Sequence, residues 1–384
     1  MAGEVLLRAG TLAGWIGSKN QVTDSQEEAK NLISESLAIF ESLRYEKKIA
    51  EAQIEIAYCY WREGRFDEAR DILNDALAHL SADNGLKAKA ILRIAIVERG
   101  AKQLNDALRI LLDNAPLFEK IENQTIKGGY HVTLANVLEN LWASERRSDY
   151  IDRAFIEYAA AGYHFEQAGH KPYLAHVENN LGFLYFKVRK YKEAHFHLNC
   201  ARSLLLNLKN YGFVAQVDET RARLFLAERR YVEAERAARS AVNLLDKGGQ
   251  QGLLYDALIT HGRALARLEC YEQAYSAWLR AVRVAQECGA TARASEAALI
   301  IIQELGERLT LEKVQNAFQG SSLVELRSYE HELIRNALIR AEGRISRAAD
   351  MLGTSHQSLA KMLQGRHRDL LPLRTPAKPR PKRK

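Results

Sequence analysis

Alanines recur along the chain at a regular spacing, each one preceded by a turn and an aromatic residue. The clearest cases are RFDEA, KYKEA, RYVEA and CYEQA, which end at Ala69, Ala194, Ala234 and Ala274. Weaker versions end at Ala29, Ala107 and Ala154. From Ala154 onward the interval is 40 residues each time, as it is between Ala29 and Ala69, whereas the two intervals in between are 38 and 47. Since forty residues is the length of one helical hairpin, the pattern predicts an array of helical hairpins.

Small residues occupy two further positions relative to these alanines. Twelve positions before an alanine stand Ala57, Ala95, Gly182, Ala222 and Gly262, and seven positions after one stand Ala76, Ala201, Ala241 and Ala281. Three positions after the first set follow the larger residues Tyr60, Tyr185, Phe225 and Leu265. Small residues let two helices approach closely, while a large side chain fills the gap to the next repeat. The spacing therefore predicts tightly packed helix pairs.

This spacing of small, small and aromatic residues resembles the tetratricopeptide repeat over about Gln26 to Gly289. The resemblance implies an all-α protein, a tetratricopeptide-like α-solenoid of about seven helical hairpins. The repeat is longer than the usual period of about 34 residues, as in bacterial peptide-pheromone receptors and the maltose-type activators, which implies extended helices. We expect an insertion near Ala143 to Tyr150, a first helix within residues 1–25, and a closing helix over Ala294 to Leu309.

The stretch from Ile345 to Leu363 has the pattern of two short helices around a glycine turn. Ala348 and Ala349 are small enough for one helix to cross closely over the other. Leu352, Leu359 and Met362 supply apolar contacts, Gly353 is expected to adopt a positive φ, and Ser355 stands at an N-cap position. The side chains left facing outward are His356, Gln357, Ser358, Ala360, Lys361 and Gln364. The sequence thus predicts a helix-turn-helix.

A further helix is predicted before this motif. Ser322 to Glu325 forms a capping box, and the helix should end at Glu342 to Arg344. Its apolar stripe consists of Leu326, Tyr329, Leu333, Ile334, Ala337 and Leu338.

Glu332 to Leu363 resembles the Fis-type helix-turn-helix, which also closes the nitrogen-regulatory enhancer-binding activators. The matching segments are ELIRNAL, GRISRAADMLGTS and QSLAKML. One departure is Thr354, where such motifs usually carry Ile or Val. The resemblance implies that the helix near Ser355 to Gln364 enters the major groove of DNA. It also implies a homodimer through the helix Leu323 to Ala341, with Leu326, Tyr329, Leu333 and Ala337 in its interface.

The excess positive charge of the chain is confined to its end. The net charge is +7, from 55 Lys and Arg against 48 Asp and Glu. The thirty residues from Ser355 to Lys384 hold nine Lys and Arg and one acid, Asp369, so the first 354 residues carry a net charge of −1. A near-neutral body with a basic end favours binding to a polyanion. The segment after the motif is broken by prolines and is expected to bury no core.

Candidate DNA-binding residues follow from these observations. Gln357 and Lys361 are long enough to reach base edges, while Ser355, His356 and Ser358 are candidates for base or phosphate contacts. The predicted phosphate contacts are Arg344, Arg347, Arg366 and Arg368, followed in the tail by Lys378, Arg380, Lys382, Arg383 and Lys384.

The first helix of each hairpin is expected to line a concave groove. The candidate groove residues are Tyr58, Trp61, Asn136, Asn140, Asn179, Phe183, Phe186, Arg223, Arg263 and Arg267. Asparagine amides both donate to and accept from an extended backbone, and arginine holds a carboxylate with two hydrogen bonds. This set predicts a protein or peptide ligand, and the alternative is an inner surface that is merely hydrated. Val132, Gln216 and Thr220 do not match the basic carboxylate clamp of chaperone-binding repeats.

The sequence contains no pattern typical of a catalytic or metal site. It has no phosphate-binding loop, HExxH or GxSxG. His195 and His197 should point apart on one helix. The cysteines Cys59, Cys200, Cys270 and Cys288 have no CxxC pair and are expected to be reduced and buried. We therefore expect no enzyme activity, cofactor or metal. No apolar run approaches the roughly 18 residues of a membrane span, and the N-terminus does not resemble a signal peptide, so a cytoplasmic location is expected.

The predicted organisation is an array over residues 1–309, a linker over 310–321, a helix-turn-helix domain over 322–371 and a disordered basic tail over 372–384. The favoured hypothesis is a bacterial transcriptional regulator that binds DNA with the second domain and a partner with the array. The alternative is a protein-interaction scaffold whose C-terminal domain is structural or protein-binding. RNA binding by the tail is a third hypothesis, although no aromatic residue for stacking follows Tyr329.

Overall fold

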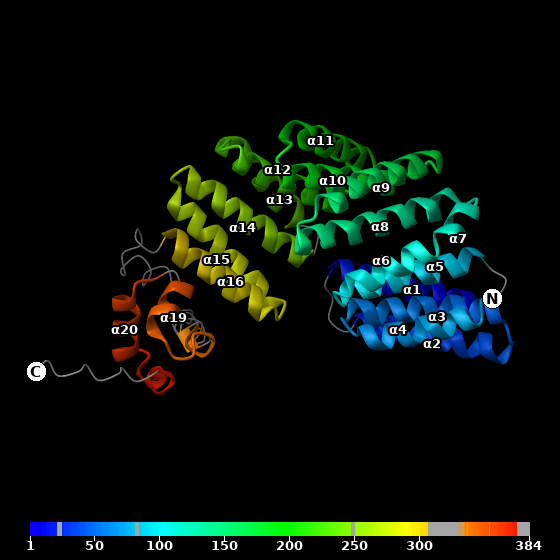
Figure 1. The fold of residues 1–384 in the computed structure, drawn as a ribbon, viewed down its shortest axis with the longest axis horizontal. Coiled ribbons are helices and arrows are strands. Elements are labelled where there is room, and N and C mark those ends of the chain that lie inside the picture. Colours follow the sequence, from blue (N-terminus) through cyan, green and yellow to red (C-terminus); the bar gives the residue numbers. More distant parts are fainter. Residues whose placement is uncertain are drawn as a thin grey trace, which may run out of the picture. The chain divides into compact units, whose positions relative to one another are not determined.

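The computed structural model describes residues 1–20, 25–80, 84–246, 250–305, 331, 334–335, 337–352 and 354–374, and its regular elements over these ranges are all helical (Figure 1). Contacts between Cα atoms divide the chain into two units, Met1–Thr260 and His261–Lys384. Each unit is described by itself. The predicted all-α class is confirmed. None of the described helices has the length and apolar character needed to cross a membrane.

The first unit consists of successive helical hairpins. The pairs are α1 (Ala2–Asn20) with α2 (Ser25–Ser42), α3 (Glu46–Arg62) with α4 (Phe66–Ala78), α5 (Asn84–Gly100) with α6 (Leu104–Asp113), α8 (Gln124–Glu145) with α9 (Ser148–Gln167), α10 (Lys171–Lys187) with α11 (Tyr191–Asn207), and α12 (Tyr211–Ala227) with α13 (Tyr231–Leu245). A short helix, α7 (Ala115–Lys120), follows α6, and α14 (Gln251–Arg267) spans the boundary between the units. The predicted hairpin array is confirmed.

The small residues of the repeat lie where the helices meet. All seven recurrent alanines are fully buried, and so are Ala57, Ala76 and Ala201. Contact is close at Gly182, where an added Cβ would lie 2.6 Å from Cγ of Leu198 on the partner helix. The repeat spacing therefore marks the helix interface, as the sequence predicted.

The hairpin formed by α8 and α9 contains its extra residues within its helices. α8 has 22 residues and α9 has 20, against 17 in α10 and α11. The two helices are lengthened at the ends that join at Arg146 and Arg147, inside the stretch where the insertion was expected. Ala135, which is fully buried, is the small residue of α8. It lies 19 residues before Ala154 instead of twelve, so counting back from Ala154 missed it.

The second unit contains α15 (Tyr271–Glu287), α16 (Thr291–Leu305) and a small C-terminal domain. α16 agrees with the predicted closing helix as far as residue 305. Residues 306–330, which include the predicted linker, the capping box, Leu326 and Tyr329, lie outside the described residues, as do Leu333, Gly353 and the tail from residue 375.

The small domain contains α19 (Ile345–Met351), α20 (His356–Gln364) and a 3-10 helix, η1 (Arg368–Leu373). The preceding helix ends in a turn where Glu342 and Gly343 have positive φ. The buried core consists of Ile334, Ala337, Leu338, Ala341, Ile345, Ala348, Ala349, Leu359, Leu363 and Leu370. The predicted helix-turn-helix is confirmed.

One expectation for this region is wrong. The segment after Leu363 was expected to bury no core, but Leu370 of η1 is buried among the residues of α19 and α20, with Leu371 partly buried beside it. The segment is rich in basic residues and proline, and these led to the expectation of no core although it also contains the adjacent Leu370 and Leu371. Pro372 is compatible with η1, which continues to Leu373, past the predicted start of the tail at residue 372.

Candidate nucleic-acid interface and ligand groove

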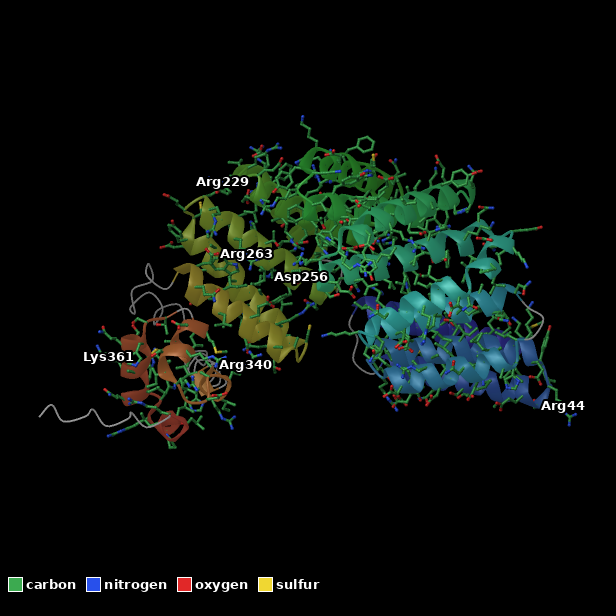
Figure 2. The ribbon with its side chains drawn as sticks, viewed as in Figure 1. Arg44, Arg229, Asp256, Arg263, Arg340 and Lys361 are labelled. Carbon is green, nitrogen blue, oxygen red and sulfur yellow. The ribbon has the colours of Figure 1, made fainter. Side chains whose placement is uncertain are left out.

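α20 presents a polar face that contains no acid. Leu359 and Leu363 are buried beneath the helix, whereas His356, Gln357, Ser358, Lys361 and Gln364 are exposed. The order of apolar and polar residues over this helix therefore fixes which side chains a ligand can reach. Lys361 is the cation of this face (Figure 2).

Ser355 caps α20 at its N-terminus, as the sequence predicted. Its hydroxyl accepts a hydrogen bond from the amide of Ser358 at 3.1 Å and donates one to the Oγ of Ser358 at 2.9 Å. These bonds occupy the Ser355 hydroxyl, so its primary role is to start the helix.

Exposed cations surround α20. The predicted phosphate contacts Arg344, Arg347, Arg366 and Arg368 are all exposed, and Arg344 lies 3.5 Å from the carboxylate of Glu342. Sequence reasoning missed Arg335 and Arg340, which are exposed on the helix before the motif; Arg340 is labelled in Figure 2. Arg335 follows the buried Ile334 and Arg340 precedes the buried Ala341, so both lie off the apolar stripe, and this position was the signal that could have found them.

The charge of the small domain is strongly asymmetric. Its described residues from 331 to 374 include eight Lys and Arg against three acids, Glu342, Asp350 and Asp369. Asp369 accepts a hydrogen bond from His331, and this bond holds the pKa of the carboxyl below its usual value. The pair links η1 to the helix before α19, and it engages Asp369, the acidic residue of η1.

The predicted dimer interface needs one correction. Ala337 is buried within the core of its own domain, so it is not exposed to a second copy. The apolar stripe of this helix faces α19 and α20 at the residues that the structure describes.

The first unit contains a cavity of about 640 Å³. It is lined by α3, α5, α8 and α10, with Phe165 contributed by α9. Polar residues on α3 and α5 include Lys47, Glu51, Lys89 and Arg93, whereas the wall from α8 and α10 includes Ile126, Val132 and Val177. First helices of consecutive hairpins thus form this site, as expected for a groove.

Apart from Asn179, which adjoins the lining residue Asn180, the predicted groove residues on α3, α8 and α10 lie nearer the C-terminal ends of these helices than the cavity does. Tyr58 stacks on Trp61 with ring centroids 4.9 Å apart. Asn136 accepts a hydrogen bond from Tyr158 at 2.7 Å, so its amide oxygen is already used. Asn140 and Phe186 are half-buried, and the buried Oδ1 of Asn179 has no hydrogen-bond partner in the part of the chain that the structure describes. Sequence reasoning missed the half of the groove that contains the cavity, because its lining residues come from four different hairpins.

The remaining predicted groove residues include three arginines. Arg223 lies 5.3 Å from the centre of the Phe183 ring, and Lys187 lies 4.7 Å from it. In the second unit, Arg267 bonds to Glu304 at 2.9 Å, and Arg263 is exposed on α14 (Figure 2).

The two histidines of α11 point apart, as predicted. His195 bonds to Glu228 at 2.7 Å and His197 bonds to Glu178 at 2.8 Å, on different neighbouring helices. Over the described ranges, no group of three or more His, Cys, Asp or Glu side chains could hold a metal ion.

The cysteines are only partly as expected. All four are free, and burial raises the pKa of the Cys59 thiol to about 11. Cys200 and Cys270 are half-buried, and the expectation of burial is wrong for Cys288, which is exposed at the C-terminal end of α15.

Comparison with known proteins places this geometry in context. Residues 325–364 match the model of the family described as bacterial regulatory protein, Fis family. A search of curated proteins gives no match to the sequence.

Several solved structures share the fold. A Rap protein complexed with competence and sporulation factor superposes with a TM-score of 0.58 and 14% identity, over 96% of this chain and 99% of that one. Aspartyl phosphate phosphatase F from Bacillus subtilis gives 0.52 and 11%, over 99% and 97%. A signal transduction ATPase with a tetratricopeptide repeat sensor from Pyrococcus horikoshii gives 0.60 and 15%, over 88% of this chain and 54% of that one. At these identities the likeness is one of fold alone. Residues 325–364 are thus a helix-turn-helix of the Fis type, and they follow an array with a tetratricopeptide-like fold.

Proposed function

We propose that this protein is a DNA-binding transcriptional regulator, without enzyme activity, that acts in the cytoplasm. The observation that carries the proposal is the exposed, acid-free face of α20 within a helix-turn-helix domain that has eight Lys and Arg against three acids. An α-helix of this kind fits the major groove, where Gln357 and Lys361 reach base edges. The surrounding arginines and the tail contact phosphates.

In the proposed arrangement the array binds a protein or peptide partner. The Rap protein of similar fold is complexed with competence and sporulation factor. Support in this chain comes from the cavity between α3, α5, α8 and α10, and from the aromatic and basic side chains further along the same helices. Pairing of two copies through the helix Leu323 to Ala341 is part of the proposal, although Ala337 takes no part in it.

Binding of the full chain to duplex DNA tests this proposal. We expect an affinity that falls steeply with salt, because Lys and Arg contacts to phosphates release counterions. Deleting Lys378 to Lys384 should weaken binding to all sequences alike, whereas Lys361→Ala should also change sequence preference. Lys192→Ala, at an exposed position of the array, is the matched control. The measurement is selection of bound sequences from a random duplex pool, followed by titration of the selected and pooled DNA.

The scaffold hypothesis is supported by one observation, the short side chains of Ser358 and Ala360 on α20. It predicts no shift of duplex DNA at low salt. That result would contradict the regulator proposal. If the deletion of Lys378 to Lys384 and Lys361→Ala each weakened binding to all DNA sequences equally, α20 would not read bases.

A further inference from the structure

The cavity of the first unit has two chemically distinct ends. Its volume of about 640 Å³ lies in the range typical of ligand sites. One end, on α3 and α5, carries Lys47, Lys89 and Arg93 with Glu51 as the carboxylate among the described lining residues. The apolar end, on α8 and α10, includes the apolar Ile126, Val132 and Val177 beside the uncharged polar Thr133, Tyr173 and Asn180.

The acids at the charged end are already paired. Glu51 bonds to Lys48 at 2.8 Å and to Arg8 at 3.0 Å. Glu55, just behind the lining, bonds to Lys89 at 2.6 Å. Burial raises the pKa of Glu55, but the charges of Lys89 and Arg93 lower it overall, so Glu55 is shared between these two cations and compensates Arg93 only in part.

Arg93 is prepared to bind an anion. Its guanidinium carbon lies 3.6 Å from the centre of the Tyr58 ring, which fixes the plane of the group. Its Nε is buried and has no hydrogen-bond partner among the described residues. Arg62 lies over the same ring at 4.3 Å, and its pKa is lowered by its burial and also by the charge of Arg93. An anion at Arg93 would relieve the repulsion between the two cations, because a carboxylate pairs with a guanidinium through charge-assisted hydrogen bonds.

The apolar end adds no opposing charge. His176 packs edge-on against Phe213, and burial lowers the pKa of its imidazole, which is therefore neutral near pH 7. Gly129 leaves the wall open, because an added Cβ would meet only Cδ1 of Leu92, at 3.6 Å. The space between α5 and α8 is thus suited to an apolar group.

We propose that this cavity binds an apolar group that carries a carboxylate, with the carboxylate at Arg93 and the apolar part against α8 and α10. The inference rests on the proposed partner-binding role of the array and narrows its ligand. A peptide with an apolar C-terminal residue and a small apolar carboxylic acid share this chemistry.

Calorimetric titration of the full chain tests the proposal with three probes. These are acetyl-Ala-Ala-Leu-Phe with a free carboxylate, the same peptide as its C-terminal amide, and decanoate. We expect the free acid to bind about tenfold or more tightly than the amide, because a charge-assisted pair is lost in the amide. Binding of decanoate alone would identify a small acid as the ligand, and binding of the peptide acid alone would identify a peptide end.

Variants assign the binding to this cavity. Arg93→Gln should abolish the preference for acid over amide, whereas Arg109→Gln, at an exposed position of α6, should retain it. Gly129→Leu should fill the cavity and prevent binding while leaving the thermal unfolding midpoint unchanged or higher, because leucine is the better helix former. The proposal is overturned if acid and amide bind equally, if neither acid binds, or if Gly129→Leu leaves binding intact. DNA titration of the same preparations separates such a failure from failure of the regulator proposal.

Discussion

Single small residues determine how closely the helices of the array approach. Gly182 and Gly162 are both glycines inside helices of the first unit, yet their surroundings differ. A Cβ on Gly182 would lie 2.6 Å from Cγ of Leu198 and 3.2 Å from its backbone nitrogen, whereas a Cβ on Gly162 would make an ordinary contact of 3.7 Å with Val177. Close packing requires glycine at the first position only.

We therefore expect Gly182→Ala and Gly162→Ala to change stability in opposite directions. Overpacking costs about 1–3 kcal/mol, which exceeds the gain of about 1 kcal/mol from replacing a helical glycine, so Gly182→Ala should be destabilising. Gly162→Ala should retain most of that gain. Thermal unfolding followed by circular dichroism measures both, and a stabilising effect at Gly182 would contradict the close approach.

Several helices of the array end in the same backbone conformation and hydrogen-bond pattern. Residues with positive φ include Arg189, Arg229 and Lys102, besides Gly64 and Gly169. After each of them an amide bonds to a carbonyl five residues back, as from Arg230 to Phe225 at 2.9 Å. This is the hydrogen-bond pattern of a Schellman motif, which ends a helix and starts the turn. Long basic side chains occupy positions where glycine is usual, so the turns could not be located from glycines alone.

Sequence reasoning did not predict that η1 contributes to the core of the small domain, and this contribution can be tested. Leu370 is 4% exposed within the core of the small domain, whereas Leu373 of the same element is 38% exposed. Leu370→Ala should destabilise the domain by about 2–5 kcal/mol because it leaves a cavity. Leu373→Ala should change stability by no more than about 0.5 kcal/mol. Hydrogen exchange of α19 and α20 in the full chain is the measurement, and equal exchange in the two variants would show that η1 is not part of the core.

At the scale of the whole molecule, the array has no single core. Its buried side chains form separate clusters, one joining α1 to α3 around Ile33 and another joining α10 to α12 around Leu198. Helices contact mainly their neighbours along the chain. Stability in such an array is close to a sum over neighbouring repeats.

Two core variants of the first unit should therefore act locally. Ile33→Ala should speed hydrogen exchange in α1 to α3 and leave α10 to α12 nearly unchanged, and Leu198→Ala should do the reverse. Each removes a fully buried side chain and should cost about 2–5 kcal/mol. Exchange that rises uniformly across the unit in either variant would mean that the array unfolds as one body.

Much of the fold could be predicted because its signals are local. The recurrent alanines repeat within one hairpin, and Ser355, Leu359 and Lys361 lie within two turns of one helix. Burial of one helical face follows from spacing of 3.6 residues per turn, which the sequence displays directly. The sequence by itself thus determined the all-helical array, the helix-turn-helix and the outward face of α20.

Other features depended on residues far apart in the chain. The small position at Ala135 was hidden because α8 and α9 are lengthened, and the role of Leu370 depends on contact with helices that precede it. The cavity brings Lys47, Arg93 and Val177 together from three hairpins. Only the tertiary structure decided these three features, because they depend on side-chain packing between helices that are far apart in the chain. A repeat period in the sequence does not show which side chains of different helices meet.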